Sequence, residues 1–440
     1  MKLSKHILFV DVDEEHKIMI NALTGRIDKI DISVFEVINK WQQCENIVPI
    51  DDYEKYLFSV LVRQNYVFRT VQEEHAQKQK IIDLLRTKHH QNNHQHKHIT
   101  FIVTYMCNFA CAYCFENATN NQRHQILTIE QVDVAFDLLG DELESISLFG
   151  GEPLLLINKD VIEYIVTKAP NKKYNITTNG YYLDEYADIL KNLASCHVMV
   201  TLDGDEHSHN KRRHLLNGQP TYHKIMNGIS RCLRNHIHVC IRMNVDMSNI
   251  DDALIQREDL LQQYAEYKDL LSFEISPMMG ALEREKTQIY EHLYRSDIQY
   301  DKNVRDRRNR FMGRFKPIVD AAIYGTRHNP VYSFCAAHNH GFFVDPYGMI
   351  YPCMPSVGIE PLSVGTYYPR YHLKEHSIRH RNIETISQCR ECGYSLVCGG
   401  GCPLNLKDYS DVMQPDCKSI RYQLHKVLPV LYKQEHEEVL

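Results

Sequence analysis

Six short apolar runs alternate with helix-patterned segments between residues 99 and 280, and this alternation limits the possible folds more than any other feature. The runs occupy residues 99–105, 145–150, 174–180, 197–204, 238–245 and 271–279. Strands that alternate with helices predict a parallel sheet, because each helix carries the chain back to the start of the next strand. We therefore predict an α/β fold with a partial (β/α)6 barrel, whose chemistry lies at the carboxyl ends of its strands.

The regions on either side of this alternation have other patterns. Residues 1–85 contain a few strands followed by two or three amphipathic helices, an order that suits a winged-helix-like α+β module. Residues 86–98 hold a tract rich in His, Gln and Asn, which we interpret as a solvated linker rather than a metal-binding tract. Residues 281–334 predict a charged helical bridge, and residues 335–440 predict a cysteine-rich C-terminal domain.

Composition restricts the class of protein. The chain has 440 residues with a formal net charge of −6, so no broad basic field attracts nucleic acid or anionic lipid. The apolar run near the N-terminus is too short for a signal peptide, and no run of about 18 apolar residues could span a bilayer. We expect a cytoplasmic protein that binds neither nucleic acid nor membrane.

Fourteen cysteines are many for a cytoplasmic protein, because disulfides are disfavoured in that compartment. Ten of them fall in clusters with short spacings, which predicts metal ligands or catalytic thiols. The other four are expected to be buried as small apolar residues: Cys44, Cys196, Cys232 and Cys240.

The first cluster, Cys107, Cys111 and Cys114, opens the loop after the first predicted strand. A structural zinc site needs four ligands, usually in two closely spaced pairs. Three thiolates in a CxxxCxxC loop better suit a [4Fe–4S] cluster with one open iron, which can bind a group that is not protein. A zinc site completed by a nearby histidine is the alternative.

Polar motifs mark the following strands. FGGEP (residues 149–153) ends the second strand, TTNG (177–180) the third and TLDG (201–204) the fourth. Arg213 follows TLDG, and Asn244 lies on the fifth strand. Taken singly, TTNG or TLDG would be an ordinary turn supported by a polar side chain. In order on successive strand ends, these motifs predict one shared site.

Together, these residues resemble the radical S-adenosylmethionine (SAM) family, whose signature is a CxxxCxΦC loop with an aromatic residue, here Tyr113, before the last cysteine. The resemblance implies that SAM chelates the open iron and that the reduced cluster cleaves SAM to a 5′-deoxyadenosyl radical, which abstracts a hydrogen atom. It implies that Cys107, Cys111 and Cys114 are the catalytic cluster ligands.

The same resemblance indicates which residues contact SAM. Glu152 and the glycine backbone are expected to hold its amino group, because a carboxylate pairs with an ammonium and glycine lets the backbone approach a ligand. The implied SAM contacts are Tyr113, Gly150, Gly151, Glu152, Pro153, Thr178, Asn179, Thr201, Asp203, Arg213 and Asn244.

The C-terminal cysteines follow the pattern Cx12Gx4C…CxxCx5CxxxC…C, which resembles the SPASM extension of the radical SAM family. The resemblance implies two auxiliary [4Fe–4S] clusters, so three in all. The distal cluster would be bound by Cys389, Cys392, Cys398 and Cys417, and the proximal one by Cys335, Cys353 and Cys402. Two zinc sites are the alternative.

The proximal set has only three cysteines. An open iron, a substrate thiol, or ligation by His338 or His340 could complete it. An open iron slightly favours thioether formation over carbon–carbon bond formation, because an exposed iron prefers a soft sulfur ligand.

Met354 helps to separate the functional alternatives. Members of the family that mature sulfatases carry an acid directly after the cysteine of the Gx4C element, but here Met354 follows Cys353. Another large group installs crosslinks in ribosomal precursor peptides, and many of its members grip the leader peptide by strand addition to a winged-helix-like module.

The prediction is therefore a radical SAM peptide maturase that forms a thioether or carbon–carbon crosslink in a precursor peptide, reduced by a low-potential donor such as flavodoxin or ferredoxin. Maturation of a sulfatase or of a protein-derived quinone is the second choice. A non-catalytic iron–sulfur protein and a DNA-binding regulator are the competing classes. Asp345 and Glu274 are candidate general bases.

Overall fold

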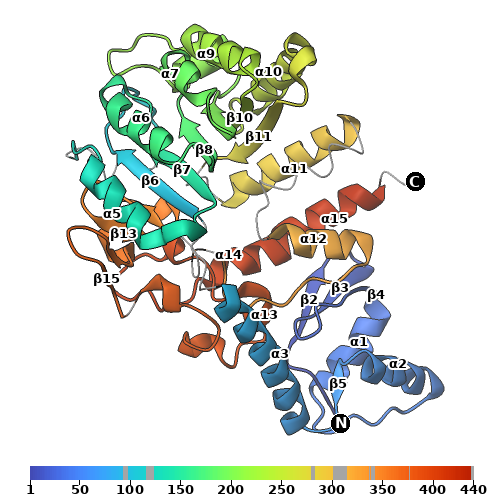
Figure 1. Cartoon of the computed structure of the whole chain (residues 1–440). Helices are drawn as coiled ribbons and strands as arrows, with labels where there is room; N and C mark the ends of the chain where they lie inside the picture. The colour runs from blue at the N-terminus through green and yellow to red at the C-terminus, as the bar shows by residue number, and fades with distance from the viewer. Residues whose placement is uncertain are drawn as a thin grey trace. The chain divides into compact units, whose positions relative to one another are not determined.

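The computed structural model (Figure 1) contains two compact units, each built from separate stretches of the chain. The first comprises residues 1–94, 290–339 and 380–440, and the second residues 95–289 and 340–379. The structure describes residues 1–92, 98–114, 123–278, 283–300, 315–335, 337, 342–375 and 377–437.

The second unit is built on the predicted parallel sheet. Its six strands lie side by side in chain order, and every neighbouring pair is parallel. They are β6 (His98–Thr104), β7 (Ser145–Gly150), β8 (Lys173–Thr178), β9 (Ser195–Thr201), β10 (His238–Val245) and β11 (Leu271–Pro277). All six coincide with the predicted apolar runs, so the prediction of a parallel α/β sheet is confirmed.

Helices connect these strands. They are α5 (Ile129–Leu139), α6 (Lys159–Lys168), α7 (Leu183–Leu190), α8 (Glu206–Arg212), α9 (Tyr222–Arg234) and α10 (Ile250–Gln263). In Figure 1, α6, α7, α9 and α10 follow one another around the outside of the strands. Strand residues such as Phe101, Leu148 and Val198 are completely buried, because helices cover the sheet and burial of apolar side chains is the main stabilising term.

Four short strands extend this sheet beyond β6: β12 (Phe343–Val344), β13 (Met349–Tyr351), β14 (Gly365–Thr366) and β15 (His372–Leu373). Strand β12 pairs in parallel with β6, with Phe343 opposite Thr100 and Val344 opposite Phe101. The remaining pairs are antiparallel. The sheet of the second unit therefore also includes β12, β13, β14 and β15.

The first unit starts with the predicted α+β segment. A meander of β2 (Ile7–Asp11), β3 (His16–Asn21) and β4 (Ile27–Asp31) is antiparallel, and β1 (Lys2–Leu3) pairs with β5 (Val67–Phe68). The helices are α1 (Ile32–Gln42), α2 (Asp52–Arg63) and α3 (Val71–Asn92). Trp41 is buried against Ile38 and Leu61, which fixes α1 and α2 to this sheet. Strands followed by helices are confirmed, and the winged-helix-like description stays a prediction.

The other helices are α11 (Glu283–Tyr300), α12 (Lys316–Tyr324), α13 (Ser395–Cys398), α14 (Cys417–Tyr422) and α15 (Leu428–Glu437). Leu8 and Val10 of β2 share one buried apolar cluster with Val319 of α12 and with Leu424 and Leu428 near the C-terminus. The first unit therefore has a core built from both ends of the chain.

Two boundaries differ from the prediction. Residues 86–92 of the expected linker are helical, because α3 continues to Asn92. Residues 335–440 were expected as one domain, but residues 340–379 are assigned to the second unit and residues 380–440 to the first. The pairing of β12 with β6 and the shared apolar cluster explain this division.

Two other expectations concern burial and membranes. Cys196 and Cys232 are buried and Cys240 is half-buried, but Cys44 is exposed, contrary to prediction.

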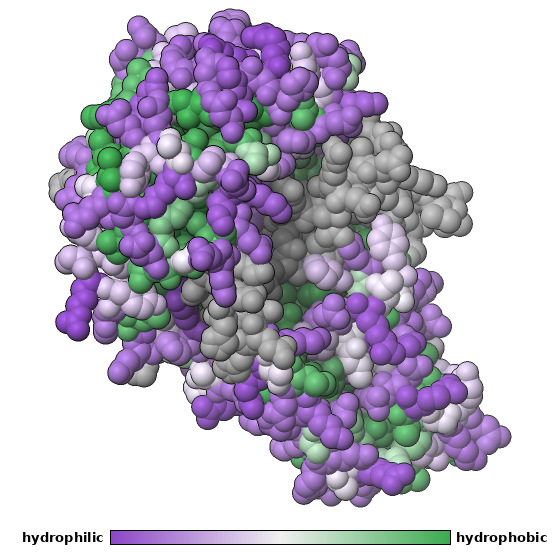
Figure 2. Space-filling model, viewed as in Figure 1, coloured by the Kyte–Doolittle hydropathy of each residue, from purple (hydrophilic) through white to green (hydrophobic). Residues whose placement is uncertain are grey.

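The face drawn in Figure 2 is mostly hydrophilic, with hydrophobic residues in small groups. Among the residues that the structure describes, no helix has the length and apolar character needed to cross a membrane.

Candidate functional site

The loop that carries Cys107, Cys111 and Cys114 begins directly after β6 and is fixed on two sides. On one side, the backbone N–H groups of Gly151 and Glu152 donate to the carbonyls of Thr104 (2.9 Å) and Met106 (2.8 Å). On the other side, residues 108–110 exchange backbone hydrogen bonds with residues 214–216. The three cysteines are therefore held at the carboxyl edge of the sheet.

Gly151 explains the glycines of FGGEP. A Cβ atom at this position would lie 2.4 Å from the carbonyl oxygen of Tyr105 and 2.5 Å from that of Met106. Only glycine permits so close an approach of two backbones. The sequence predicted a glycine that makes room for a ligand, but in this structure the glycine makes room for the cysteine loop.

Glu152 is the central acid of the site, and it is almost completely buried. Its Oε1 accepts hydrogen bonds from the Thr178 hydroxyl (2.6 Å) and the Leu154 N–H (2.8 Å), and its Oε2 accepts from the Asn179 N–H (2.6 Å). Burial raises the pKa of Glu152, whereas these hydrogen bonds and the charge of Arg213 act in the opposite direction. One carboxylate thus joins the ends of β7 and β8.

Asn179 connects the same region to the cysteine loop. Its Nδ2 donates to the Asn108 side-chain oxygen at 2.8 Å and lies 3.9 Å from the sulfur of Cys107. Its Oδ1 accepts from the N–H of Tyr181 at 2.9 Å, which orients the amide. The predicted site residues Glu152, Thr178 and Asn179 therefore meet beside Cys107.

Tyr113 is the centre of a second hydrogen-bond network, which lies near the carboxyl ends of β9 and β10. Its hydroxyl donates to Asp203 and accepts from Arg213 Nη1 at 2.6 Å and from Asn244 Nδ2 at 3.4 Å. The backbone N–H of Asn244 donates to Asp203 Oδ1 at 3.0 Å. Burial raises the pKa of the Tyr113 phenol, and the charge of Asp203 adds to that effect while Arg213 opposes it. The structure thus brings together four of the predicted SAM contacts.

Sequence reasoning missed the residues that support this network. His209 Nδ1 lies 3.2 Å from the N–H of Asp203, and its Nε2 lies 3.1 Å from the Thr221 hydroxyl. Asn249 donates to the carbonyl of Asp203 at 3.1 Å, and Arg212 Nε lies 3.7 Å from Asp203 Oδ2. His209 and Arg212 lie within nine residues of TLDG, but nothing in their spacing separates them from surface residues.

Two predicted contacts have less distinctive surroundings. Pro153 follows Glu152, and its carbonyl accepts from the Asn158 amide at 2.9 Å. Thr201 is buried at the end of β9, in register with Arg242 of β10. Both lie at strand ends, as predicted.

The chemistry of the three thiols suits an iron–sulfur cluster. Burial raises the pKa of Cys107 to about 12, with the charge of Glu152 adding to that shift and Arg213 opposing it. Burial also raises the pKa of Cys111, which lies within electrostatic range of Cys114. Such thiols stay protonated until a metal displaces the proton, and the buried guanidinium of Arg213 then offsets the negative charge of the thiolates.

A single metal ion fits less well. Among the residues that the structure describes, no three His, Cys, Asp or Glu side chains are arranged around one point that could hold such an ion. The cysteines of a [4Fe–4S] cube each bind a different iron, so they need not converge on one point. Three cysteines are one ligand short of a structural zinc site, whereas they match a [4Fe–4S] cluster with one open iron.

The four distal cysteines lie together in the first unit. The N–H of Cys392 donates to the carbonyl of Cys389 at 3.2 Å. Cys389 is within electrostatic range of Cys392 and Cys417, and Cys398 of Cys389 and Cys417. Asp416 caps α14, which begins at Cys417, and a Cβ on Gly401 would lie 2.3 Å from the carbonyl oxygen of Asp416.

Arg381 is a buried cation beside these thiols. Its guanidinium donates to the carbonyls of Gly400 (3.0 Å), Gly401 (3.2 Å) and Gln414 (2.7 Å). Burial lowers the pKa of Arg381, while the neighbouring thiols of Cys402 and Cys389 act to raise it. A buried positive charge among thiols fits an anionic iron–sulfur cluster.

The proximal set is divided between the units. Cys335 and Cys402 belong to the first unit, whereas Cys353 belongs to the second, where it follows β13. Shared ligation by these three cysteines therefore stays a prediction. The candidate ligands His338 and His340 lie outside the described residues.

The two candidate bases have structural partners. Asp345 is completely buried and accepts from the Tyr105 hydroxyl (2.7 Å) and from the N–H groups of Met349 (2.9 Å) and Tyr347 (3.0 Å). Glu274 on β11 lies 3.6 Å from Arg242 Nη1. The bonds of Asp345 suit a structural acid that closes the β12–β13 turn onto β6.

Residues 101–253 match the family model of the radical SAM superfamily. The chain contains a radical SAM domain. This domain includes the cysteine loop and the strand-end residues of β7, β8, β9 and β10. Enzymes of the superfamily use a [4Fe–4S] cluster and SAM, and residues 101–253 contain the cysteine loop that the cluster needs.

Other similarities agree with this assignment. The chain is 24% identical over 158 residues to the sporulation killing factor maturation protein SkfB of Bacillus subtilis (strain 168), and the match covers 36% of each chain. It resembles anSMEcpe with bound AdoMet and Kp18Cys peptide (TM-score 0.54, 17% identity, 77% of this chain and 98% of that chain). It also resembles Streptococcus suis SuiB bound to precursor peptide SuiA (TM-score 0.52, 15% identity, 94% of this chain and 99% of SuiB). The structural similarities confirm the radical SAM fold.

Proposed function

We propose that this radical SAM enzyme is a peptide maturase. It cleaves SAM reductively and abstracts hydrogen from a ribosomal precursor peptide, which then forms a thioether or carbon–carbon crosslink. The observation that carries the proposal is the convergence of the Cys107 loop with the Glu152 and Tyr113 networks at the strand ends. The maturation protein SkfB and the SuiB structure with precursor peptide SuiA support a peptide as substrate.

Cys107, Cys111 and Cys114 would hold the cluster, and SAM bound at its open iron would supply the radical. Glu152 positions the ammonium group of SAM. A carboxylate accepts about four hydrogen bonds, and three of those of Glu152 are used within the protein. The remaining acceptor position would bind the ammonium.

Tyr113 and Arg213 hold the far side of the same site. Arg213 is within electrostatic range of Cys107 and Cys111, so its charge compensates that of a thiolate-bound cluster. The Tyr113 hydroxyl fixes Arg213 and Asp203, which orients the last turn of the cysteine loop. Because these groups are largely buried, water is kept from a reactive radical.

The C-terminal cysteines hold two further clusters in this proposal, the distal one at Cys389, Cys392, Cys398 and Cys417 and the proximal one at Cys335, Cys353 and Cys402. Both relay electrons or bind a substrate thiolate. A low-potential flavodoxin or ferredoxin supplies the electrons. The mutual proximity of the distal thiols supports the first of these assignments.

The N-terminal module binds the precursor peptide. Its sheet has the order β2-β3-β4, so β2 and β4 are the outer strands to which an extended peptide can add. Near this sheet in sequence, four large apolar side chains are at least half exposed: Val48, Ile50, Tyr53 and Tyr56. Such a group is typical of a surface that binds an apolar segment of a partner.

Met354 disfavours sulfatase maturation, the second candidate. Its side chain packs, partly buried, against the apolar cluster that contains Tyr105 and Tyr351, and a thioether cannot accept the proton that an acid would.

The test of the proposal uses anaerobically reconstituted full-length protein with dithionite, SAM and candidate precursor peptides. Formation of 5′-deoxyadenosine together with loss of hydrogen mass from one peptide supports it, and C107A should yield neither. A protein with intact clusters that forms 5′-deoxyadenosine but leaves every tested peptide unchanged, while altering a different class of substrate, would contradict it.

A further inference from the structure

The N-terminal module makes hydrogen bonds and ion pairs with the segment 384–393, which carries Cys389 and Cys392. Lys78 and Arg86 of α3 contact residues 384–391, and Lys5 pairs with Glu391. The Arg86 guanidinium binds both oxygens of Glu384, at 2.9 and 2.5 Å. All of these residues belong to the first unit.

This contact is tight at Gly393, next to Cys392. A Cβ on Gly393 would lie 2.6 Å from the carbonyl oxygen of Lys5. His6 Nδ1 lies 3.4 Å from the Gly393 carbonyl. The backbone before β2 therefore packs directly against the CxxC segment.

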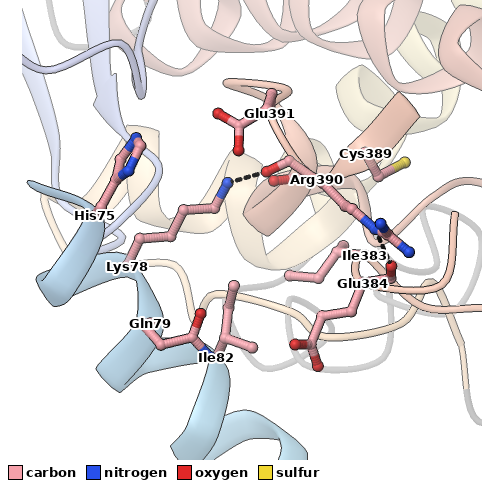
Figure 3. Close-up of a pocket in the computed structure, with 10 residues that line it drawn as sticks. His75, Lys78, Gln79, Ile82, Ile383, Glu384, Cys389, Arg390 and Glu391 are labelled. Carbon is pink, nitrogen blue, oxygen red and sulfur yellow. Dashed lines mark hydrogen bonds between the residues drawn. The ribbon is translucent and has the colours of Figure 1, made fainter. Parts of the chain in front are cut away.

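Lys78 is the buried member of this contact. Only 7% of the residue is exposed, and its ammonium donates to the carbonyl of Arg390, which lies between Cys389 and Cys392 in the chain. Figure 3 shows the side chain reaching from α3 to this carbonyl. Lys78 and Arg390 both line a cavity of about 360 Å³. Burial of an ammonium is unfavourable unless nearby negative charge compensates it.

The carboxylates nearby compensate Lys78 only in part. The Glu391 side chain is 75% exposed and already pairs with Lys5, so water screens its charge. Glu74 is buried but accepts from the Ser4 hydroxyl and the Lys5 N–H. The thiols of Cys392 and Cys389 are also within electrostatic range of Lys78, and they would become thiolates in a cluster.

We infer that Lys78, a residue of the N-terminal module, raises the reduction potential of the distal iron–sulfur cluster. The inference rests on the proposed cluster at Cys389, Cys392, Cys398 and Cys417. Reduction adds one negative charge to the cluster, and a buried cation behind its binding loop stabilises the reduced form more than the oxidised form. Through its charge, Lys78 thus couples the proposed peptide-binding module to the reduction potential of the distal cluster.

The test measures a potential rather than turnover. The background is the full chain with Cys107, Cys111 and Cys114 replaced by alanine, so that only the C-terminal clusters contribute to the spectra. K78M, K78R and K80M are reconstituted in this background, and each is titrated with dithionite under EPR detection. Lys80 is the matched control, because it lies exposed on the same helix and its loss changes the net charge equally.

One midpoint potential should shift to a more negative value in K78M and stay at the reference value in K78R and K80M. If K78M binds less iron, the titration is made on K78Q, and K78R must still match the reference. An unshifted potential in K78M with full iron content overturns the inference, and so does an equal shift in K80M. If C389A/C392A binds as much iron as the reference protein, the proposed cluster itself is wrong, which is a separate result.

Discussion

Replacement of Glu152 by glutamine removes one acceptor without changing the shape of the side chain. The two carboxylate oxygens accept from two backbone N–H groups, those of Leu154 and Asn179, on opposite oxygens. A glutamine amide has one oxygen and one NH2 group. In either orientation, the N–H of Leu154 or of Asn179 therefore meets the NH2 group and loses its acceptor. A buried donor without a partner costs about 1–3 kcal/mol, and we expect a loss of about 2 kcal/mol.

The assay is equilibrium urea unfolding of the iron-free protein, followed by circular dichroism. With a denaturant slope of about 3 kcal/mol per M, a loss of about 2 kcal/mol lowers the midpoint by about 0.7 M. E163Q is the matched control, because Glu163 lies exposed on α6, 3.9 Å from Lys159 across one helical turn. Such a surface pair contributes at most about 0.5 kcal/mol. If E152Q unfolds at the midpoint of E163Q, the hydrogen bonds assigned to Glu152 are wrong.

Three further predictions follow from other parts of the structure. Burial lowers the pKa of His328 to about 4, so below pH 6.5 the unfolded state binds a proton that the folded state excludes. The free energy of unfolding should therefore fall as the pH drops, by about 2 kcal/mol at pH 5. In urea titrations at several pH values, H328Q should show a weaker dependence of stability on pH. G151A should displace the cysteine loop and lower the iron bound per chain. G325A, at a position in the first unit that has a positive φ and no neighbour near its Cβ, should retain the iron in iron analysis. I50S/Y56S should weaken binding of a labelled precursor peptide on the order of tenfold in fluorescence anisotropy, and unchanged affinity would place the peptide elsewhere.

The parallel strands were predictable because their sequence signals are local. Each apolar run is bounded by polar turn residues, and a buried parallel strand needs only such a run. The position of the polar residues followed from the same rule, since Thr178, Thr201 and Asn244 lie at or near the ends of strands that share one edge. The parallel sheet and the places of these residues along its strands were thus accessible without coordinates.

The partners within the site were not predictable. Glu152 was expected to face a ligand, but two backbone N–H groups and a hydroxyl occupy most of its acceptor positions. His209 supports Asp203 through a contact that depends on how α8 leaves β9, and no pattern in the sequence encodes that geometry. Strand β12 has two residues, which is too short for any periodicity to be visible, so the division of residues 335–440 could not be foreseen.

The apolar cluster shared by β2 and the C-terminal helices has a consequence for synthesis of the chain. A growing polypeptide exposes Leu8 and Val10 long before Leu424 and Leu428 have been synthesised. The N-terminal sheet must therefore wait, with one apolar face uncovered, until these later residues are available. A fragment that contains the N-terminal module alone would keep that face exposed and would be prone to aggregate.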